Sequence, residues 1–341
     1  MKKDITFTVP CYNSEDYMER CIDTLLSGDD CVEIIIVDDG STDGTGEIAD
    51  NYARNYPEIV RVVHQENGGH GAGVNAGLAL AAGKYFKVVD SDDWLDEGEL
   101  KKLLQRIRQW EKSGAEVDLI ICNYIYDHFY ENKTKRMGYK NVLRENQICG
   151  WNDIRHFRPS QYLVMHSLFF RTEVLRQSGV KLPRHTFYVD NIFANQPLPY
   201  VKTLCYLNLD MYHYFLGRED QSVNEKVLMQ RIDQQIRVTK LVSGCSDLEK
   251  VREKHPKLAD YLTRNISIMM AISSIHLLLI GTPEAWEKRE MLWNYVKNHD
   301  RKLYQTLRFR TLSGFTFLPG KFGAGLTLAG YKTAQKFYKF N

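Results

Sequence analysis

Two stretches of the chain decide the fold: Glu33-Ile34-Ile35-Ile36-Val37-Asp38-Asp39-Gly40-Ser41 and Tyr85-Phe86-Lys87-Val88-Val89-Asp90-Ser91-Asp92-Asp93. Each is a mostly apolar run, typical of a strand buried on both faces, and each ends in a cluster of acids. Helical patterns at 45–55 and 72–82 flank a third strand-like run at 60–64. This alternation predicts parallel β-α-β units, in which ligands gather beyond the carboxyl ends of the strands.

The remaining chain adds further strands and then changes character. A first strand is expected at 5–9, followed by a helix over 15–26 with Ser14 as its N-cap. Beyond residue 224 only helical patterns occur, so we expect a catalytic domain over 1–225 and a helical C-terminal region over 226–341. The other expected elements are a helix at 100–110, a strand at 117–126, a polar hairpin at 132–139, a strand at 167–171, a helix at 173–177 and two β-rich runs at 201–207 and 211–216.

The composition is that of an ordinary folded protein, with 43% hydrophobic and 26% charged residues and a net charge of +2. This small charge does not favour nucleic acid as a partner. The seven cysteines form no CxxC pair, which indicates free thiols in a reducing compartment. Residues 1–4 run straight into the first expected strand, so we expect no signal peptide, and the apolar stretch 266–280 is shorter than the ~20 residues of a spanning helix. We therefore expect a cytoplasmic protein.

The acids after the 85–89 strand suggest a metal site. Asp90 and Asp92 are separated by one residue, and hard oxygen ligands of this kind suit Mg²⁺ or Mn²⁺ bound to a nucleotide diphosphate. Such a cation offsets the negative charge that builds up on a departing diphosphate. The structural alternative is that residues 91–93 cap the next helix.

Two further polar clusters lie at the same predicted sheet edge. Asp39 could accept a hydrogen bond from the imide of uracil or from a ribose hydroxyl, although Asp38-Asp39-Gly40-Ser41 also suits a type I turn. The link Asn67-Gly68-Gly69-His70 would let backbone approach a phosphate at a helix N-terminus. The stretch 71–76 also resembles the dinucleotide fingerprint of nicotinamide-dependent oxidoreductases, but it follows the third strand instead of the first.

Taken together, these motifs resemble the inverting glycosyltransferase family 2, whose fold is the GT-A α/β sandwich. The resemblance is specific because four motifs occur in the family's order and spacing. It is strong over residues 4 to 110 and can be followed to about 225, and it does not identify the C-terminal region. The motifs are Thr8-Val9-Pro10-Cys11-Tyr12-Asn13, then Ile36 to Thr45, then Asn67-Gly68-Gly69 with Asn75-Ala76-Gly77, and Tyr85 to Asp93.

The resemblance implies a nucleotide sugar donor, with uridine diphosphate favoured, and a divalent cation. Asp39 is then expected to contact the base, Asp92 to be the principal metal ligand, and Asp90 to lie near the metal and the sugar or ribose. Where many relatives carry Arg or Lys before the second helix, this chain has His70 and Asn75, which leaves the donor contact there open. The other expected donor-binding residues are Pro10 and Tyr12 around the base, Asn67, Gly68 and Ser91, and Arg218 and Ser222 in the segment that closes over the donor.

An inverting transfer needs a carboxylate that removes the proton of the attacking hydroxyl. The family's Glu-Asp pair corresponds to Val189-Asp190 here, so Asp190 is the expected base, and it could equally cap a helix over 191–196. The change to Val189 leaves open an altered acceptor pocket or a silent scaffold of the same fold. His213 could ligate a metal or pack in the core, and Met165-His166-Ser167 is expected on the acceptor side.

The C-terminal tail is basic and aromatic, with no acid after Asp300. Such a tail suits an anionic membrane surface, and simple docking or oligomerisation is the alternative. A lipid-linked acceptor would make such attachment sensible. We expect a glycan, polyol-phosphate or lipid-linked acceptor of the cell envelope, and a location that includes the inner face of the membrane.

Overall fold

The computed structural model describes residues 2–128, 133–159, 161–217 and 225–338. The chain divides into two compact units, Met1–Gly217 and Arg218–Asn341. Each unit is described by itself.

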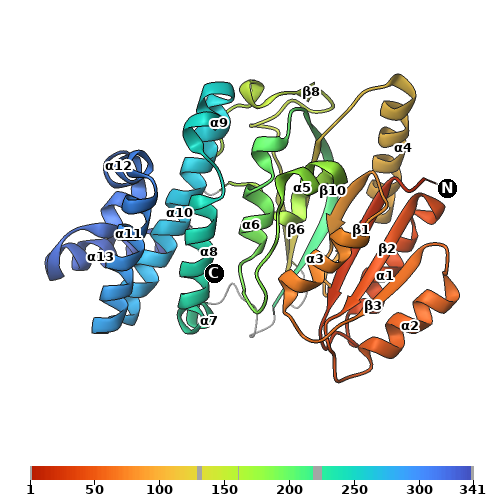
Figure 1. Ribbon diagram of the computed structural model, residues 1–341, viewed down its shortest axis with the longest axis horizontal. Helices are drawn as coiled ribbons and strands as arrows, with labels where there is room; N and C mark the ends of the chain where they lie inside the picture. Colours follow the sequence, from red (N-terminus) through yellow and green to blue (C-terminus); the bar gives the residue numbers. More distant parts are fainter. Residues whose placement is uncertain (1, 129–132, 160, 218–224, 339–341) are drawn as a thin grey trace. The chain divides into compact units, whose positions relative to one another are not determined.

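Unit 1 is built on one mixed β-sheet with the strand order β3-β2-β1-β4-β9-β6-β10-β5, to which β7 adds on β6 and β8 adds on β10 (Figure 1). The first four strands of this order are parallel, while β9 is antiparallel to both of its neighbours. The strands are β1 (Ile5–Cys11), β2 (Val32–Asp38), β3 (Val60–His64), β4 (Tyr85–Val88), β5 (Trp94–Leu95), β6 (Leu119–His128), β7 (Lys133–Met137), β8 (Ile148–Cys149), β9 (Leu168–Arg171) and β10 (Leu204–Leu216).

The helices of unit 1 pack on this sheet, with α3 against β1 and β2 and α4 against β10. All seven residues of β1 and of β2 are buried, which agrees with strands covered on both faces. The helices are α1 (Met18–Leu26), α2 (Thr45–Asn55), α3 (His70–Leu80), α4 (Glu97–Ser113), α5 (Thr172–Ser178) and α6 (Asp190–Asn195), with 3₁₀ turns η1 (Asp29–Cys31), η3 (Trp151–Asp153), η4 (Met165–Ser167) and η5 (Leu198–Tyr200).

The structure corrects several local expectations. Helix α1 begins at Met18, and Ser14 makes no side-chain cap because its hydroxyl bonds within the preceding turn. The residues 91–93 cap no helix, since α4 begins after β5 and Asp96 is its N-cap, accepting from the backbone N–H of Glu99. The two β-rich runs near residue 210 form one strand, β10, with register shifts between Tyr206 and Tyr212.

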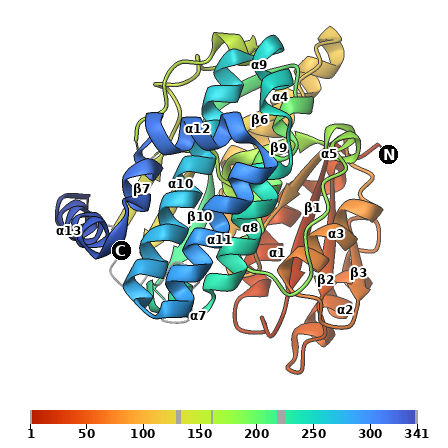
Figure 2. The ribbon, with the colours of Figure 1, turned by 60° about the vertical axis from the view of Figure 1, so that its left-hand side comes forward.

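Unit 2 consists of helices in its described part (Figure 2). The apolar stretch at 266–280 lies in α10, whose 25 residues make it longer than the sequence suggested and long enough to cross a membrane. However, 61% of its most apolar window is buried inside the protein, as in a core helix. The elements are α7 (Glu225–Gln230), α8 (Ile232–Gly244), α9 (Leu248–Lys254), α10 (Pro256–Ile280), α11 (Pro283–His299), α12 (Arg301–Arg310), η6 (Leu312–Phe317) and α13 (Gly320–Tyr338).

Candidate functional site

The carboxyl ends of β1, β2 and β4 meet at one edge of the sheet because these three strands are parallel neighbours. Tyr12 and Asp39 lie directly after β1 and β2, and Asp90 follows the end of β4 by two residues, so all three belong to this edge. The hydroxyls of Ser14 and Ser91 are 2.8 Å apart and join the loops that follow β1 and β4. The sequence prediction that these polar clusters share one edge is therefore consistent with the strand order.

Asp39 fastens the Gly-rich link to the sheet edge. Its side chain is only 2% exposed, and its carboxylate accepts hydrogen bonds from the Gln65 amide at 2.6 Å and from the backbone N–H groups of Gly68 and Gly69 at 2.9 and 2.7 Å. The Asn67 amide donates to the Asp39 carbonyl at 2.9 Å. Because a carboxylate has about four acceptor positions, most of those on Asp39 are already used, and its contact with a base stays a prediction.

His70 connects the acids of the site. It is the first residue of α3, and its Nε2 lies 2.8 Å from Oδ1 of Asp90. Burial would lower the pKa of His70, but the charges of Asp90, Asp190 and Asp92 raise it above its ordinary value. Burial would raise the pKa of Asp90, but the charges of His70, His166 and Lys87 lower it. Thus Asp90 and Asp190 gather around the N-terminus of the helix whose preceding link is held by Asp39.

Asp190 occupies the first position of α6. Burial raises the pKa of its carboxyl group, and the charge of Asp90 adds to this while His70 opposes it. The segment before it is strained: Tyr188 has a φ of 65°, a conformation that bulky residues rarely adopt and that often marks functional sites. Val189, which stands where the family pattern has an acid, is 2% exposed.

A group of possible metal ligands lies beside these residues. One ligand atom each of Asp90, Asp93 and His166 lie within 4.8 Å of one another. Within the described part of the chain, Nδ1 of His166 is buried and has no hydrogen-bond partner. Burial lowers the pKa of His166 to about 4, so the imidazole is neutral near pH 7, which is the form that binds metals. These donors fit a divalent cation such as Mn²⁺. The expected principal ligand Asp92 is not a member of this group.

Asp93 also has a structural role. Its carboxylate accepts hydrogen bonds from the Tyr212 hydroxyl and, at 2.8 Å, from the backbone N–H of Phe215. The Tyr212 hydroxyl in turn accepts from the backbone N–H of Asp90 at 3.2 Å. Burial, with the charges of Asp92 and Asp90, raises the pKa of Asp93 well above its ordinary value. Asp93 therefore joins the end of β10 to the acidic loop.

Lys87 is a residue of this region that the sequence reasoning missed. It lies on β4, has no exposed surface, and its ammonium donates to the backbone carbonyls of Met165 at 2.8 Å and His166 at 2.7 Å. The ammonium also lies 4.6 Å from the centre of the Tyr212 ring. A lysine inside an otherwise apolar strand was the available signal. Its effect is to hold turn η4, and with it His166, against the sheet.

Arg184 was also missed. A Cβ on Gly68 would lie 2.9 Å from its Nε, and its guanidinium lies 3.4 Å from the Asn67 carbonyl. The positively charged side chain of Arg184 therefore lies beside the Gly-rich link, although residue 184 is distant from this link in the sequence. No local sequence pattern connected residue 184 with residues 67 and 68, so only the fold reveals this neighbour.

The stretch that resembles a dinucleotide fingerprint serves helix packing. A Cβ on Gly71 would lie 2.9 Å from the Cβ of Leu182, and a Cβ on Gly73 would lie 2.9 Å from the Cβ of Pro10. These glycines are therefore required by the close approach of α3 to the segment at Leu182 and to β1. This explains their spacing without a nicotinamide cofactor.

Some expected site residues have other positions. His213 stacks on Trp94 with ring centres 5.1 Å apart and lies 3.4 Å from Asp127, which is a packed environment. Tyr12 is 54% exposed at the end of β1, whereas Pro10 is buried within that strand. Arg218 and Ser222 lie outside the described residues.

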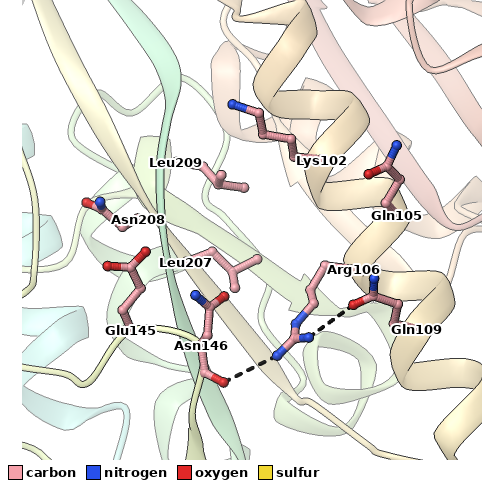
Figure 3. A pocket seen from close by; sticks show the side chains of 9 residues that line it. All are labelled: Lys102, Gln105, Arg106, Gln109, Glu145, Asn146, Leu207, Asn208 and Leu209. Carbon is pink, nitrogen blue, oxygen red and sulfur yellow. Dashed lines mark hydrogen bonds between the residues drawn. The ribbon is translucent and has the colours of Figure 1, made fainter.

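A pocket of about 480 Å³ lies elsewhere in unit 1, between α4 and the irregular part of β10 (Figure 3). The Arg106 guanidinium spans it, donating to Gln109 at 3.0 Å and to the Asn146 carbonyl at 3.3 Å. None of the expected donor, metal or base residues lines this pocket. Its lining is Lys102, Gln105, Arg106, Gln109, Glu145, Asn146, Leu207, Asn208 and Leu209.

Comparison with known proteins gives the same family that the motifs suggested. Residues 6–170 match the profile of glycosyl transferase family 2. EpsH of Bacillus subtilis (strain 168), which is named as a glycosyltransferase, is 30% identical over 227 residues, or 62% of this chain and 60% of EpsH. The poly(ribitol-phosphate) beta-glucosyltransferase of Bacillus spizizenii is 39% identical over 95 residues, or 27% of this chain and 15% of that protein. The chain thus matches at most 60% of the length of these curated relatives.

A solved structure extends the comparison to the fold. The crystal structure of residues 1–349 of S. aureus TarS in complex with UDP-GlcNAc matches with a TM-score of 0.69 and 18% sequence identity, covering 97% of this chain and 92% of that one. The fold is therefore GT-A with a helical C-terminal region, as predicted. Through residues 6–170 the chain belongs to glycosyl transferase family 2.

Proposed function

We propose that this protein is an inverting glycosyltransferase that moves a sugar from a nucleotide diphosphate donor, with uridine diphosphate favoured, to a hydroxyl of a cell-envelope acceptor. One observation carries the proposal: His70, at the N-terminus of α3 and next to the link that Asp39 holds, lies 2.8 Å from Asp90. The charge of Asp190, from a distant part of the chain, also raises the pKa of His70. The acceptor class is a polysaccharide, a teichoic-acid-like polymer or a lipid-linked glycan, by analogy with the named activity of the poly(ribitol-phosphate) relative.

The donor would lie along the sheet edge at the N-terminus of α3. The half-exposed ring of Tyr12 is available to contact the base, with Pro10 behind it and Asp39 at the same edge. The unpaired N–H groups at the start of a helix attract an anion, so the diphosphate would lie near Gly68. The remaining proposed donor contacts are Asn67, Asp90 and Ser91, with Arg218 and Ser222 from the segment after β10. A cytoplasmic location follows from the use of a nucleotide sugar.

A divalent cation, Mn²⁺ or Mg²⁺, would be held by Asp90 with Asp92. His166, whose ligand atom lies within 4.8 Å of one on Asp90, would be a further ligand, and its nitrogen would favour Mn²⁺ because Mg²⁺ prefers oxygen. When bound, the cation offsets the negative charge that develops on the leaving diphosphate. His70 supports this arrangement by holding one oxygen of Asp90.

Asp190 would be the general base. It accepts the proton of the acceptor hydroxyl while that oxygen attacks the anomeric carbon from the face opposite the diphosphate, which inverts the configuration. Burial raises the pKa of Asp190 from its ordinary value, so its carboxylate is a stronger base than an exposed one. The strained Tyr188 before it fixes the start of α6, where this carboxylate is attached.

The test is transfer by an Asp190→Asn variant, measured as release of the nucleoside diphosphate with an acceptor extract. We expect turnover to fall about 100-fold or more while donor affinity is retained. Asp30→Asn is the matched control, because this exposed acid lies before β2, at the opposite end of the sheet. Unchanged turnover in Asp190→Asn would contradict the assigned base, and no turnover in the wild type with any nucleotide sugar would favour a silent scaffold.

A thermal-shift screen would identify the donor. Only the correct nucleotide sugar, together with Mn²⁺, is expected to stabilise the protein strongly, because stabilisation grows with the ratio of ligand concentration to Kd.

A further inference from the structure

Unit 2 exposes large apolar side chains close to one another in the chain. Five of them, all in the segment from α12 to α13, are half or more exposed to solvent. A folded protein rarely leaves large apolar groups together on its surface unless they contact a partner or a membrane. With three exposed cations of the same segment they form what we call the basic aromatic surface: Phe309, Arg310, Leu312, Phe315, Lys321, Phe322, Leu326 and Lys332.

The segments that carry this surface are packed on each other. Turn η6 contacts both α12 and α13. The Thr327 hydroxyl of α13 donates to the Phe315 carbonyl of η6 at 2.8 Å, and the Arg308 guanidinium of α12 donates to the Gly314 carbonyl of η6 at 2.8 Å. The surface is therefore part of a folded structure and not a loose end.

Helix α13 has an unusual division between its two faces. Its inner face carries small residues, namely the buried Gly323, Ala324 and Thr327. Its outer face carries Phe322 and Leu326, which are one helical turn apart. An ordinary surface helix places large apolar residues inside and polar residues outside. In the part of α13 whose side chains are described, Phe322 and Leu326 thus face solvent, while the small residues face the protein core.

The charge of this segment has one sign. Between residues 301 and 341 the sequence has eight Lys and Arg residues and no Asp or Glu. In the described part of the chain, the exposed Arg310, Lys321 and Lys332 make no ion pair with an acidic side chain. These cations are therefore available to an external anionic partner.

Aromatic and aliphatic side chains among lysines and arginines are the pattern of segments that lie in the headgroup region of an anionic membrane. A symmetric contact between two copies fits less well, because it would bring the same cations of both copies together. We propose that the basic aromatic surface attaches this protein to a membrane with anionic headgroups, inserting Phe322 and Leu326 at the interface. This inference does not depend on the proposed glycosyl transfer.

The test is co-sedimentation of the full chain with vesicles of phosphatidylcholine alone and of phosphatidylcholine mixed with phosphatidylglycerol. We expect binding to the anionic vesicles that weakens with added salt. The double variant Phe322→Ser/Leu326→Ser should bind them about tenfold more weakly for each apolar side chain lost. The double variant Lys321→Gln/Lys332→Gln should bind about fivefold more weakly for each cation lost.

The matched control is Met291→Ser, which removes an exposed apolar side chain of α11 outside the basic aromatic surface and should bind like the wild type. Equal thermal unfolding of all variants would show that they are folded. Absence of wild-type binding to anionic vesicles would overturn the proposal, as would equal binding of wild type and Phe322→Ser/Leu326→Ser. Self-association in solution that this double variant abolishes would also overturn it, because the surface would then be a contact between copies. These readouts use no donor or acceptor, so their failure differs from a failure of the proposed activity.

Discussion

Because Lys87 is buried, we predict that it makes the free energy of unfolding depend on pH. Replacing Lys87 by methionine keeps a chain of similar length and removes the two hydrogen bonds to the carbonyls of Met165 and His166. Burial lowers the pKa of Lys87 to about 7 in the folded protein. A lysine in an unfolded chain has a pKa of about 10.4. Unfolding between these two pH values therefore takes up a proton at this residue.

Stability rises with pH wherever the unfolded chain binds more protons than the folded one. Lys87 destabilises the folded protein fully below about pH 7, and this penalty shrinks as the pH approaches the unfolded pKa. Its contribution to the free energy of unfolding therefore increases by up to about 1.4 kcal/mol per pH unit in this window. The free energy of unfolding of the wild type minus that of Lys87→Met should therefore increase by about 2 to 3 kcal/mol from about pH 7.5 to about pH 9.5.

The assay is urea denaturation of both proteins at the two pH values. Other groups that titrate in this range contribute to both proteins and cancel in the difference. Lys102→Met, which removes an exposed lysine of α4, is the control and should give a difference that does not change with pH. If the difference in unfolding free energy between wild type and Lys87→Met is also independent of pH, Lys87 does not have a lowered pKa, because the buried ammonium would then stay charged at pH 9.5.

Two further predictions concern the sheet. The hydrogen bond that Nδ1 of His64 donates to the Asp38 carboxylate at 2.8 Å raises the pKa of His64, so its stabilising effect is complete below the unfolded pKa of about 6.5 and is lost as the pH rises through the folded value. His64→Gln should therefore lower the Tm more at about pH 5.5 than at about pH 8, and an equal loss at both would contradict the ion pair. Gly77→Ala should cost about 2 kcal/mol or more in urea unfolding, since the new methyl meets Thr8, whereas Gly325→Ala, with open space around it, should stabilise by about 0.5 to 1 kcal/mol. Similar changes in both glycine variants would exclude the clash.

The fold could be predicted because the apolar runs of single strands and the order of strands and helices along the chain indicate the same parallel sheet. The isoleucine run of β2 and the apolar run of β4 fixed two buried parallel strands, and the acids after them marked the edge where the site lies. The predicted helix boundaries were wrong where a side chain had two possible partners. Serine is a common helix N-cap, but the hydroxyl of Ser14 bonds within its own loop and with Ser91, so α1 begins at Met18.

The site could be predicted only as far as its residues belong to motifs. The positions of Asp39, Asp90 and Asp190 follow from motif spacing, but their hydrogen-bond partners do not. Arg184 reaches the Gly-rich link from a distant segment. The sequence predicts Asp93 only as part of a possible helix cap, whereas its carboxylate accepts from residues of β10. Such pairings depend on which strands become neighbours, and a single sequence does not contain that information locally.

If the acids of this sheet edge serve one donor site, a calorimetric titration of UDP with and without Mn²⁺ should show it. The wild type should bind UDP more tightly with Mn²⁺, Asp90→Asn should lose this gain, and Asp190→Asn should keep it. Failure of the wild type to bind UDP would contradict a shared donor site. A manganese-dependent gain in UDP affinity that survives in Asp90→Asn would also contradict it.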